Sequence, residues 1–394
     1  MFEYVLEAIK NGYFNIPFYL EDKKIDFNKI KNKDDFLNLP FTIKEDLRNT
    51  SPYRRTNTDK KDIYGLYSSN GTTGKKTFYV YNKNDRNKQA EFVRKFYSAL
   101  GMKAGGLGAV LGQIGSPVMG HCMMWQFEAM NMGMTLCPEP SPENIITLLN
   151  ELPITDIAAL PQIASLVGIK QEWVETARKS TVERLILGGD FLSETRRQLL
   201  EEMWGAKVYN SFGMSEAFGP LGNECKEQKG FHYLDKDLYI EIISPDNGKP
   251  VKFGECGVGV YTTLWNKGFP LLRYWSGDML KMVSEPCGCG SELPRFDYIG
   301  RMCDCVKLSC GRIVSPKEVE KITLKENILR YQIKVYENKL LFVYDEKGVE
   351  PSIKLLEKVK QLFDMKVIST EAVSVEKLNI RGLKPKYIVD YRGL

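Results

Sequence analysis

Residues 206–220 read AKVYNSFGMSEAFGP. The start of this stretch predicts a β-strand, and an aromatic residue, a Gly, a hydroxyl and a carboxylate stand in a row at the end of that strand. This strand is the last of a series of apolar runs that alternate with helical patterns between residues 105 and 215. The predicted strands are VLGQI, MTLCP, DIAALP, ERLILGG and AKVYNSFG, and the predicted helices include NIITLLNELP and LSETRRQLLEEMW. Strands and helices in alternation predict a layered α/β domain with a largely parallel sheet.

The pattern changes after residue 230. FHYLDKDLYIEIIS and GVGVYTTLW alternate their side chains on either side of the turn-rich PDNGKP, which predicts an antiparallel β-subdomain. After residue 300 the elements become shorter and predict a small α+β unit. Because 394 residues are too many for one core, we predict a large N-terminal domain of residues 1–299, a hinge at 300–306 and a small mobile C-terminal domain of residues 307–394.

Composition excludes several classes of protein. Apolar residues make up 43% and charged residues 27%, which is ordinary for a globular protein, and no segment has the roughly 18 unbroken apolar residues of a membrane helix. The N-terminus lacks the basic start and apolar centre of a signal peptide. The net charge of +5 is spread along the chain, which disfavours nucleic acid as a partner. Nine cysteines without a disulfide-type framework favour a cytoplasmic protein.

A second stretch, YSSNGTTGKKT at residues 67–77, suits an anionic ligand. Glycines let successive backbone N–H groups converge, and such nests bind anions. The hydroxyl groups add donors and the lysines add positive charge, so phosphate is the natural ligand. The spacing is not that of a Walker loop, and taken alone the stretch is equally compatible with a flexible polar turn.

Two further stretches make the pattern specific. LLRYWSGDML (271–280) puts an Asp after Ser-Gly at a strand end, and GRMCDCVKLSCGRIVSPKEVE (300–320) begins the small unit. Together with YNSFGMSEAFGP and the loop, these motifs resemble, in order and spacing, the adenylate-forming superfamily of acyl-CoA synthetases. Within it the chain is most similar to phenylacetate-CoA ligase and its relatives, which include coenzyme F390 synthetase, from about residue 60 to the end.

This resemblance implies a role for each motif. The loop at 69–76 would hold the β- and γ-phosphates of ATP, and Glu216 would bind Mg²⁺, a hard cation that prefers oxygen ligands. Asp278 would accept both ribose hydroxyls, and Arg301 would reach the ribose or the α-phosphate. The other residues implied in nucleotide binding are Ser69, Gly71, Thr72, Thr73, Gly74 and Lys75 in the loop, Gly188, Gly189 and Asp190 along the adenine, Asn210 near its amino group, Phe212 stacking on it, and Gly213 and Ser215 beside it.

The resemblance also implies a catalytic Lys near the C-terminus. In the tail IRGLKPKYIVDYRGL, counting back from Asp390 places Lys384 on that position, with Lys386 as the alternative. A positive charge there would offset the negative charge that develops at the α-phosphate. The family hinge normally carries an acidic pair, whereas this chain has Cys303–Asp304, which puts in doubt how the enzyme changes between its adenylating and thioester-forming arrangements.

A separate set of residues predicts a metal site. Cys225 and His232 are followed by Cys287 and Cys289, and three thiolates with one imidazole complete a tetrahedral, structural Zn²⁺ site. Similar elements in zinc-bearing members of the subfamily agree with this set. One alternative is a four-Cys site made of Cys287, Cys289, Cys303 and Cys305. The other is that the thiols are free and buried.

The implied reaction is a two-step ligation. A carboxylic acid, by resemblance an aryl or arylacetic acid, reacts with Mg·ATP to give an acyl-adenylate, and a thiol, by resemblance CoA, then displaces AMP. Met119, His121, Met123, Met214 and Phe218 would suit a flat apolar ring, although methionines at such spacing are more often core. The alternatives are a carrier-protein thiol as acceptor, adenylation without thioester formation, and a nucleotide- and zinc-dependent binding protein without turnover. A homodimer is left open.

Overall fold

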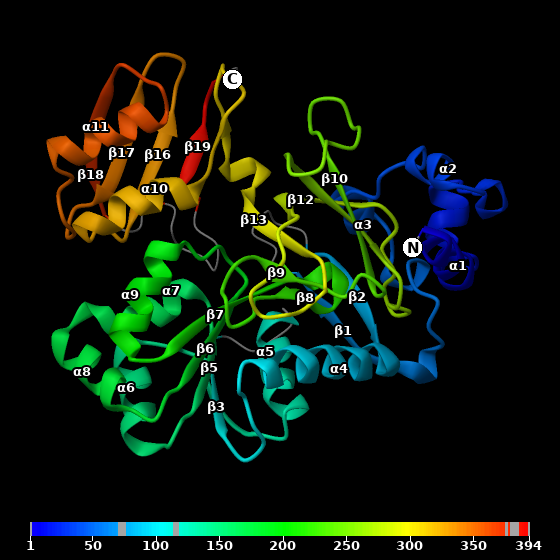
Figure 1. Ribbon diagram of the computed structural model, residues 1–394, viewed down its shortest axis with the longest axis horizontal. Coiled ribbons are helices and arrows are strands. Elements are labelled where there is room, and N and C mark those ends of the chain that lie inside the picture. Colours follow the sequence, from blue (N-terminus) through cyan, green and yellow to red (C-terminus); the bar gives the residue numbers. More distant parts are fainter. Residues whose placement is uncertain (1, 70–75, 113–117, 375–376, 379–385, 393–394) are drawn as a thin grey trace. The chain divides into compact units, whose positions relative to one another are not determined.

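The computed structural model describes residues 2–69, 76–112, 118–374, 377–378 and 386–392 (Figure 1). The chain forms two compact units. Unit 1 contains the residues up to 189 together with 203–276 and 280–297. Unit 2 contains residues 190–202, 277–279 and 298–394. The domain limits and the hinge expected from the sequence stay predictions.

The predicted parallel sheet is present, and antiparallel strands extend it. The order of the 11-stranded sheet in the described chain is β10-β11-β12-β13-β9-β8-β7-β6-β5-β3-β4. The pairs from β4 to β7 are parallel, and those from β7 to β9 are antiparallel. The strands are β3 Leu107–Leu111, β4 Gly133–Cys137, β5 Asp156–Ala159, β6 Arg184–Gly188, β7 Lys207–Met214, β8 Gly219–Asn223, β9 Phe231–His232, β10 Leu238–Ile243, β11 Cys256–Thr263, β12 Tyr274–Val283 and β13 Arg295–Arg301. The predicted α/β fold class is confirmed.

Helices α4 and α5 cover part of this sheet and contact β8 and each other. Phe92 and Phe96 of α4 and Phe127 of α5 are buried in one core with Ile186 and Tyr209 of the sheet. A separate hairpin of two antiparallel strands precedes α4. The helices and strands of this part of the chain are α1 Phe2–Tyr13, α2 Lys33–Leu37, α3 Lys44–Asn49, β1 Ile63–Ser68, β2 Phe78–Asn82, α4 Lys83–Ala99, α5 Val118–Ala129, α6 Pro142–Glu151, α7 Pro161–Ala164, α8 Gln171–Lys179 and α9 Glu194–Trp204.

The N-terminal segment is fixed to the sheet at β12. The guanidinium of Arg273 is 2% exposed, makes a bidentate pair with Glu241 and donates to the carbonyl of Leu37 at 2.6 Å. Thr42 donates its backbone N–H to the carbonyl of Arg273 and accepts from the N–H of Trp275. The carboxylate and the carbonyl groups replace the hydration that the Arg273 guanidinium loses when it is buried. This joint therefore holds the start of α3 in a defined place.

Unit 2 has its own core. The four-stranded sheet has the order β18-β17-β16-β19, and α10 and α11 supply buried Val319, Leu355 and Val359 to the same apolar cluster. Arg196 of α9 and Glu320 of α10 form an almost fully buried ion pair in this unit. The elements are β14 Val306–Lys307, β15 Ile313–Val314, α10 Pro316–Thr323, β16 Tyr331–Val335, β17 Leu340–Asp345, α11 Ile353–Leu362, β18 Ile368–Val373 and β19 Ile388–Asp390.

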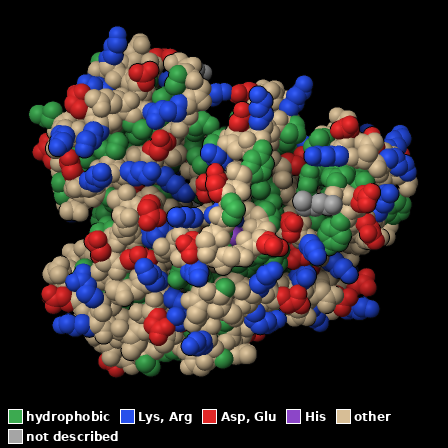
Figure 2. Space-filling view, in the orientation of Figure 1, with side chains coloured by type: hydrophobic (Ala, Val, Ile, Leu, Met, Phe, Trp, Pro, Cys, Tyr) green, Lys and Arg blue, Asp and Glu red, His purple; other side chains and the backbone are tan. Residues whose placement is uncertain are grey.

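The surface agrees with the charge pattern of the sequence. On the face seen in Figure 2, Lys and Arg side chains are interspersed with Asp and Glu side chains. Among the described residues, no helix has both the length and the apolar character needed to cross a bilayer.

A buried carboxylate in α4 ties that helix to the loop before β12. Asp85, at the first turn of α4, accepts from the backbone N–H groups of Lys267 at 3.0 Å and Gly268 at 2.6 Å. Burial raises the pKa of Asp85 to about 6, because the charged form loses hydration that these two N–H groups only partly replace.

We expect this carboxylate to make stability depend on pH. The folded state binds its proton more tightly than the unfolded chain, so the stabilisation is complete below about pH 4 and is lost as the pH rises through about 6. Between pH 4 and pH 7, ionisation of Asp85 should lower the free energy of unfolding of the wild type by up to about 3 kcal/mol. Asp85→Asn should remove this part of the pH dependence. Denaturant unfolding at several pH values measures this. An unchanged pH profile would contradict it, and the exposed Asp246→Asn is the matched control.

Candidate functional site

The flanks of the predicted phosphate loop come together. Ser69 donates its backbone N–H to the carbonyl of Thr77 at 3.0 Å, and the Thr77 N–H donates to the Ser69 Oγ at 3.4 Å. Both residues are buried and continue the pairing of β1 with β2. Gly71, Thr72, Thr73, Gly74 and Lys75 lie outside the described residues, as does Lys384. The two ends of the loop are therefore held at one place.

Glu216 lies in a short helical turn between β7 and β8 and is only 7% exposed. Its Oε1 accepts from the hydroxyl of Tyr274 at 3.4 Å and lies 3.7 Å from the Nζ of Lys44. Burial and then the nearby Glu216 carboxylate raise the pKa of Tyr79, which faces the same group from β2. A buried carboxylate with one cation and two phenols around it retains oxygen lone pairs for a hard cation such as Mg²⁺.

The backbone before Glu216 leaves no room for a side chain at residue 213. A Cβ on Gly213 would lie 2.4 Å from the carbonyl oxygen of Gly219, so β7 and β8 approach here only because residue 213 is glycine. The carbonyl of Ser215 accepts from the buried hydroxyl of Tyr81 at 2.7 Å. Asn210 is buried on β7, where its N–H donates to the carboxylate of Glu224 at 2.7 Å. These contacts fix the path of the strand that presents Glu216.

Phe212 lies in an aromatic core. Its ring is 5.2 Å from that of Phe296, 5.8 Å from that of Phe231 and 6.3 Å from that of Tyr261, and the residue is 9% exposed. These contacts pack the ring within the protein, and the predicted stacking of Phe212 on adenine stays a prediction.

A second aromatic group surrounds Trp125, in the region that the sequence suggested for the acid. The ring of Trp125 stacks on Phe218 at 5.6 Å with 22° between the planes, and the guanidinium of Arg86 lies 4.8 Å from its centroid. Tyr67 is 5.6 Å from Trp125 and 4.9 Å from His121. We call Tyr67, Tyr81, His121, Trp125 and Phe218 the aromatic cluster. Met123 of α5, in contrast, is buried in the core that this helix shares with α4 and the sheet, as the alternative interpretation of the methionines expected.

Three residues predicted for the nucleotide lie near one another in unit 2. Burial alone would lower the pKa of Arg301, but Asp278 and Tyr298 beside it raise that pKa above its usual value. Burial raises the pKa of Tyr298, and the carboxylates of Asp278 and Asp190 raise it further. Asp190 also accepts from the N–H of Phe191 at 2.8 Å. Asp190, Asp278 and Arg301 therefore share one charged neighbourhood around the half-buried phenol of Tyr298.

The predicted metal residues converge within unit 1. The ligand atoms of Cys225, His232, Cys287 and Cys289 all lie within 4.8 Å of one another. The sulfurs of Cys225 and Cys287 are 3.5 Å apart, and the sulfur of Cys289 is 3.5 Å from Nε2 of His232. These separations suit a tetrahedral ion with metal–sulfur bonds of about 2.3 Å, which puts neighbouring sulfurs about 3.8 Å apart.

Hydrogen bonding prepares the imidazole for a metal. Nδ1 of His232 is 3.0 Å from the carbonyl oxygen of Leu293, so that nitrogen carries the proton and Nε2 is left as the ligand. Among the described residues this is the group that brings Cys and His side chains together, whereas Cys303 contacts Asp304. The Cys₃His set therefore has the geometry of a metal site, and the four-Cys alternative has no such support.

Sequence reasoning missed Lys44, Tyr79 and Tyr274. Lys44 and Glu216 are far apart in the chain and meet because residues 39–42 dock on β12 through Arg273. The N-terminal 60 residues carry no motif by which Lys44 could be chosen. Tyr274 stands in the quoted motif LLRYWSGDML and begins β12, whereas Asp278, which the sequence placed at a strand end, lies within that strand. Lys386, the alternative catalytic Lys, is described, and its carbonyl accepts from Gln332 at 2.9 Å.

Comparison with solved structures defines the class of this fold. The chain superposes on a 2-hydroxyisobutyryl-CoA ligase, solved with an acyl-AMP in its postadenylation state, with a TM-score of 0.84 over 98% of this chain and 88% of that one at 18% identity. An anthranilate CoA ligase in complex with anthranoyl-AMP gives 0.61 over 80% and 64% at 14% identity. The fold is therefore that of the adenylate-forming enzymes. No protein-family model matches the chain.

Sequence comparison places the chain more narrowly. It is 31% identical over 341 residues to a phenylacetate-coenzyme A ligase of Thermus thermophilus, covering 82% of this chain and 74% of that protein. The phenylacetate-coenzyme A ligase of Escherichia coli is 26% identical over 349 residues, which cover 83% and 76%. The chain belongs to the phenylacetate-CoA ligase family, and its predicted enzyme class, an AMP-forming acid–thiol ligase, is confirmed.

We expect Lys44 to contribute to ATP binding rather than to stability. Lys44→Met should raise the KM for ATP about 10-fold, because a cation beside the proposed magnesium ligand can pair with phosphate. A half-exposed ion pair contributes little to stability, so the melting temperature should change little.

Steady-state kinetics with varied ATP, together with thermal unfolding, measure both effects. Lys44→Arg should restore most of the affinity, and Lys10→Met is a control at an exposed lysine. An unchanged KM for ATP would contradict this role of Lys44.

Proposed function

We propose that this chain activates an aryl or arylacetic acid with ATP and transfers the acyl group to CoA. The observation that carries the proposal is the buried carboxylate of Glu216, next to Lys44 and in the same unit as the converging flanks of the phosphate loop. The phenylacetate-coenzyme A ligases to which the chain is similar support the acid and the thiol.

In the first step, an oxygen of the acid attacks the α-phosphorus of ATP. A new P–O bond forms, the bond to the leaving pyrophosphate breaks, and an acyl-adenylate results. The loop 69–76 binds the phosphates, and Lys384 offsets the negative charge that builds at the α-phosphate. Mg²⁺ held by Glu216 would neutralise phosphate charge when bound.

In the second step, the sulfur of the thiol attacks the acyl carbon and loses its proton, and the bond to AMP breaks. An acyl-adenylate is a mixed anhydride, so its carbonyl reacts where a free carboxylate would not. Asp278 and Arg301 are proposed to hold the ribose, with the half-buried Tyr298 near both as a support. The C-terminal domain, residues 307–394, is proposed to move about the hinge at 300–306 between the two steps.

The cluster of Cys225, His232, Cys287 and Cys289 is proposed to bind Zn²⁺ as a structural ion. Three thiolates and one imidazole leave no open coordination position, so this site does not act on the substrate. Its ligands come from segments 62 residues apart in the chain, and the ion would tie them together.

Two alternatives concern the acceptor and the assembly. A carrier-protein thiol in place of CoA, or adenylation alone, would use the same first step. Thioester assays with CoA present or absent separate these reactions, and sedimentation measures whether the chain is a homodimer.

All nine cysteines are described and none is in a disulfide, which supports the cytoplasm as the compartment.

The central test is acid-dependent exchange between pyrophosphate and ATP. Across a library of carboxylic acids, we expect aryl and arylacetic acids to promote exchange. Glu216→Gln should lower its rate by about 100-fold, because it removes a charged ligand for the metal, and Asp278→Asn should raise the KM for ATP by about 10- to 100-fold. The exposed Glu143→Gln is the matched control. The proposal is wrong if no acid promotes exchange or if both variants behave as the wild type.

The metal prediction has its own measurement. Elemental analysis should find about one zinc per chain, and Cys287→Ser should lose the metal and lower the melting temperature by several degrees, since a structural ion contributes folding free energy. Cys256→Ser, at a half-buried thiol outside the cluster, should keep both. Equal metal content in the two variants would contradict the assignment.

A further inference from the structure

We infer that Phe218 is a specificity-determining residue that limits the length of the acid by separating the acid site from an apolar cleft. The inference rests on the proposed function and adds to it the residue that sets substrate size. Phe218 stands two residues after Glu216, the proposed magnesium ligand.

The backbone of Phe218 is in an unusual conformation. Its φ of 66° and ψ of 37° place it in the left-handed region, which residues other than glycine seldom adopt. Gly219 follows with a φ of 108°, and a Cβ there would lie 2.7 Å from the amide nitrogen of Gln89. The chain thus turns sharply after Glu216 and holds an aromatic ring where glycine would be less strained, which indicates that the ring itself is needed.

One set of contacts joins Phe218 to the aromatic cluster. Its ring centroid is 3.8 Å from that of Tyr81 and 5.6 Å from that of Trp125. An aromatic substrate that stacked between Phe218 and Trp125 would need these two rings about 7 Å apart, so that it could make a van der Waals contact with each. The observed separation is smaller, so the space between the pair is closed to an aromatic substrate. The acid can therefore reach the cluster only from its half-exposed members, Tyr67 and His121.

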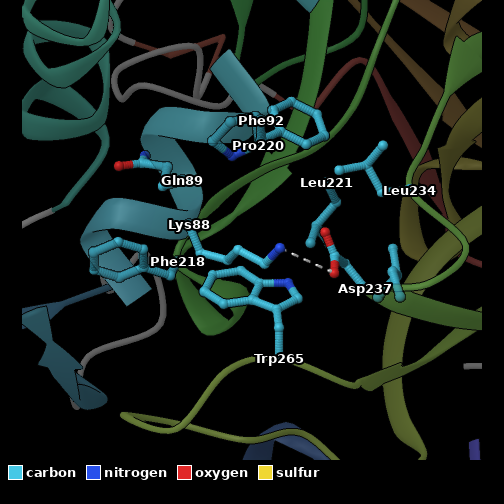
Figure 3. A pocket seen from close by; sticks show the side chains of 10 residues that line it. Lys88, Gln89, Phe92, Phe218, Pro220, Leu221, Leu234, Asp237 and Trp265 are labelled. Carbon is cyan, nitrogen blue, oxygen red and sulfur yellow. Dashed lines mark ion pairs between the residues drawn. The ribbon is translucent and has the colours of Figure 1, made fainter. Parts of the chain in front are cut away.

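A second set of neighbours lies in the cleft shown in Figure 3. Phe218 lines it together with the apolar side chains of Phe92, Leu221, Leu234 and Trp265. The cleft has room for only about one water molecule, too little for a ligand of its own.

The polar pair at this cleft is loose. The ammonium of Lys88 lies 3.8 Å from the carboxylate of Asp237, and Lys88 is 42% exposed (Figure 3). Such a pair can separate at little cost, so it does not close the cleft firmly.

These observations give Phe218 a defined effect. The ring is 1% exposed and is shared by the cluster and the cleft, so removing it would join the two spaces. In the wild type, the Phe218 ring keeps the two spaces apart, so the enzyme would accept a phenyl ring but reject a phenyl ring that carries a long apolar substituent. A shortened residue 218 would let that substituent enter between Phe92 and Trp265.

The test compares phenylacetate with 4-butylphenylacetate in pyrophosphate exchange. In Phe218→Ala and Phe218→Gly, we expect the ratio of kcat/KM for the long acid to that for the short acid to rise by about 10-fold or more, since each methylene accommodated in an apolar site contributes a several-fold preference. The exposed Phe253→Ala, the same chemical change elsewhere, should leave the ratio unchanged. Phe218→Leu should give a smaller change and serves if the shorter variants do not fold.

A second arm does not depend on turnover. Without ATP, 4-butylphenylacetate should raise the melting temperature of Phe218→Ala more than that of the wild type, because it fills the space that the ring left. Adding Leu234→Trp to Phe218→Ala should fill the cleft and abolish both gains. Unchanged ratios in all three Phe218 variants, with exchange on phenylacetate intact, would overturn the inference while leaving the proposed function standing. Absence of exchange in the wild type would instead overturn the proposed function.

Discussion

The site depends on the partners of one carboxylate inside the protein. Glu216 is buried, and burying a charge costs free energy unless the charge is paired and hydrogen-bonded. The ammonium of Lys44 and the hydroxyl of Tyr274 stabilise the charge from two directions. Each of these partners is held in turn by a separate part of the fold: Lys44 begins α3, and Tyr274 begins β12. The arrangement places fixed dipoles and charges around a group that would otherwise need water.

The strands of the large sheet were predictable because their signals are local. Buried parallel strands are continuous apolar runs, and DIAALP and ERLILGG are such runs at the positions of β5 and β6. The grouping of Cys225, His232, Cys287 and Cys289 was predictable because few residue types bind metal and because similar elements occur in zinc-bearing members of the subfamily, although the sequence left a four-Cys set open.

Contacts between distant segments were not predictable in the same way. Lys44 is one of many lysines, and nothing in the residues around it indicates that it meets Glu216, 172 residues later in the sequence. The burial of Phe212 among Phe231 and Phe296 was equally hidden, because an aromatic residue before a glycine suits both a stacking platform and a core. Phe218 could be named as apolar, but its left-handed backbone is a property of the folded turn.

The joint between Arg273 and the segment around residues 37–42 matters for the construction of chimeric enzymes. Those residues precede every motif quoted from the sequence, yet their contacts fix the start of the helix that brings Lys44 to Glu216. The segment is thus a structural support of the candidate site. A recombined enzyme that combined this nucleotide face with a foreign N-terminus would lose the anchor on Glu241 and, with it, the counter-charge to Glu216.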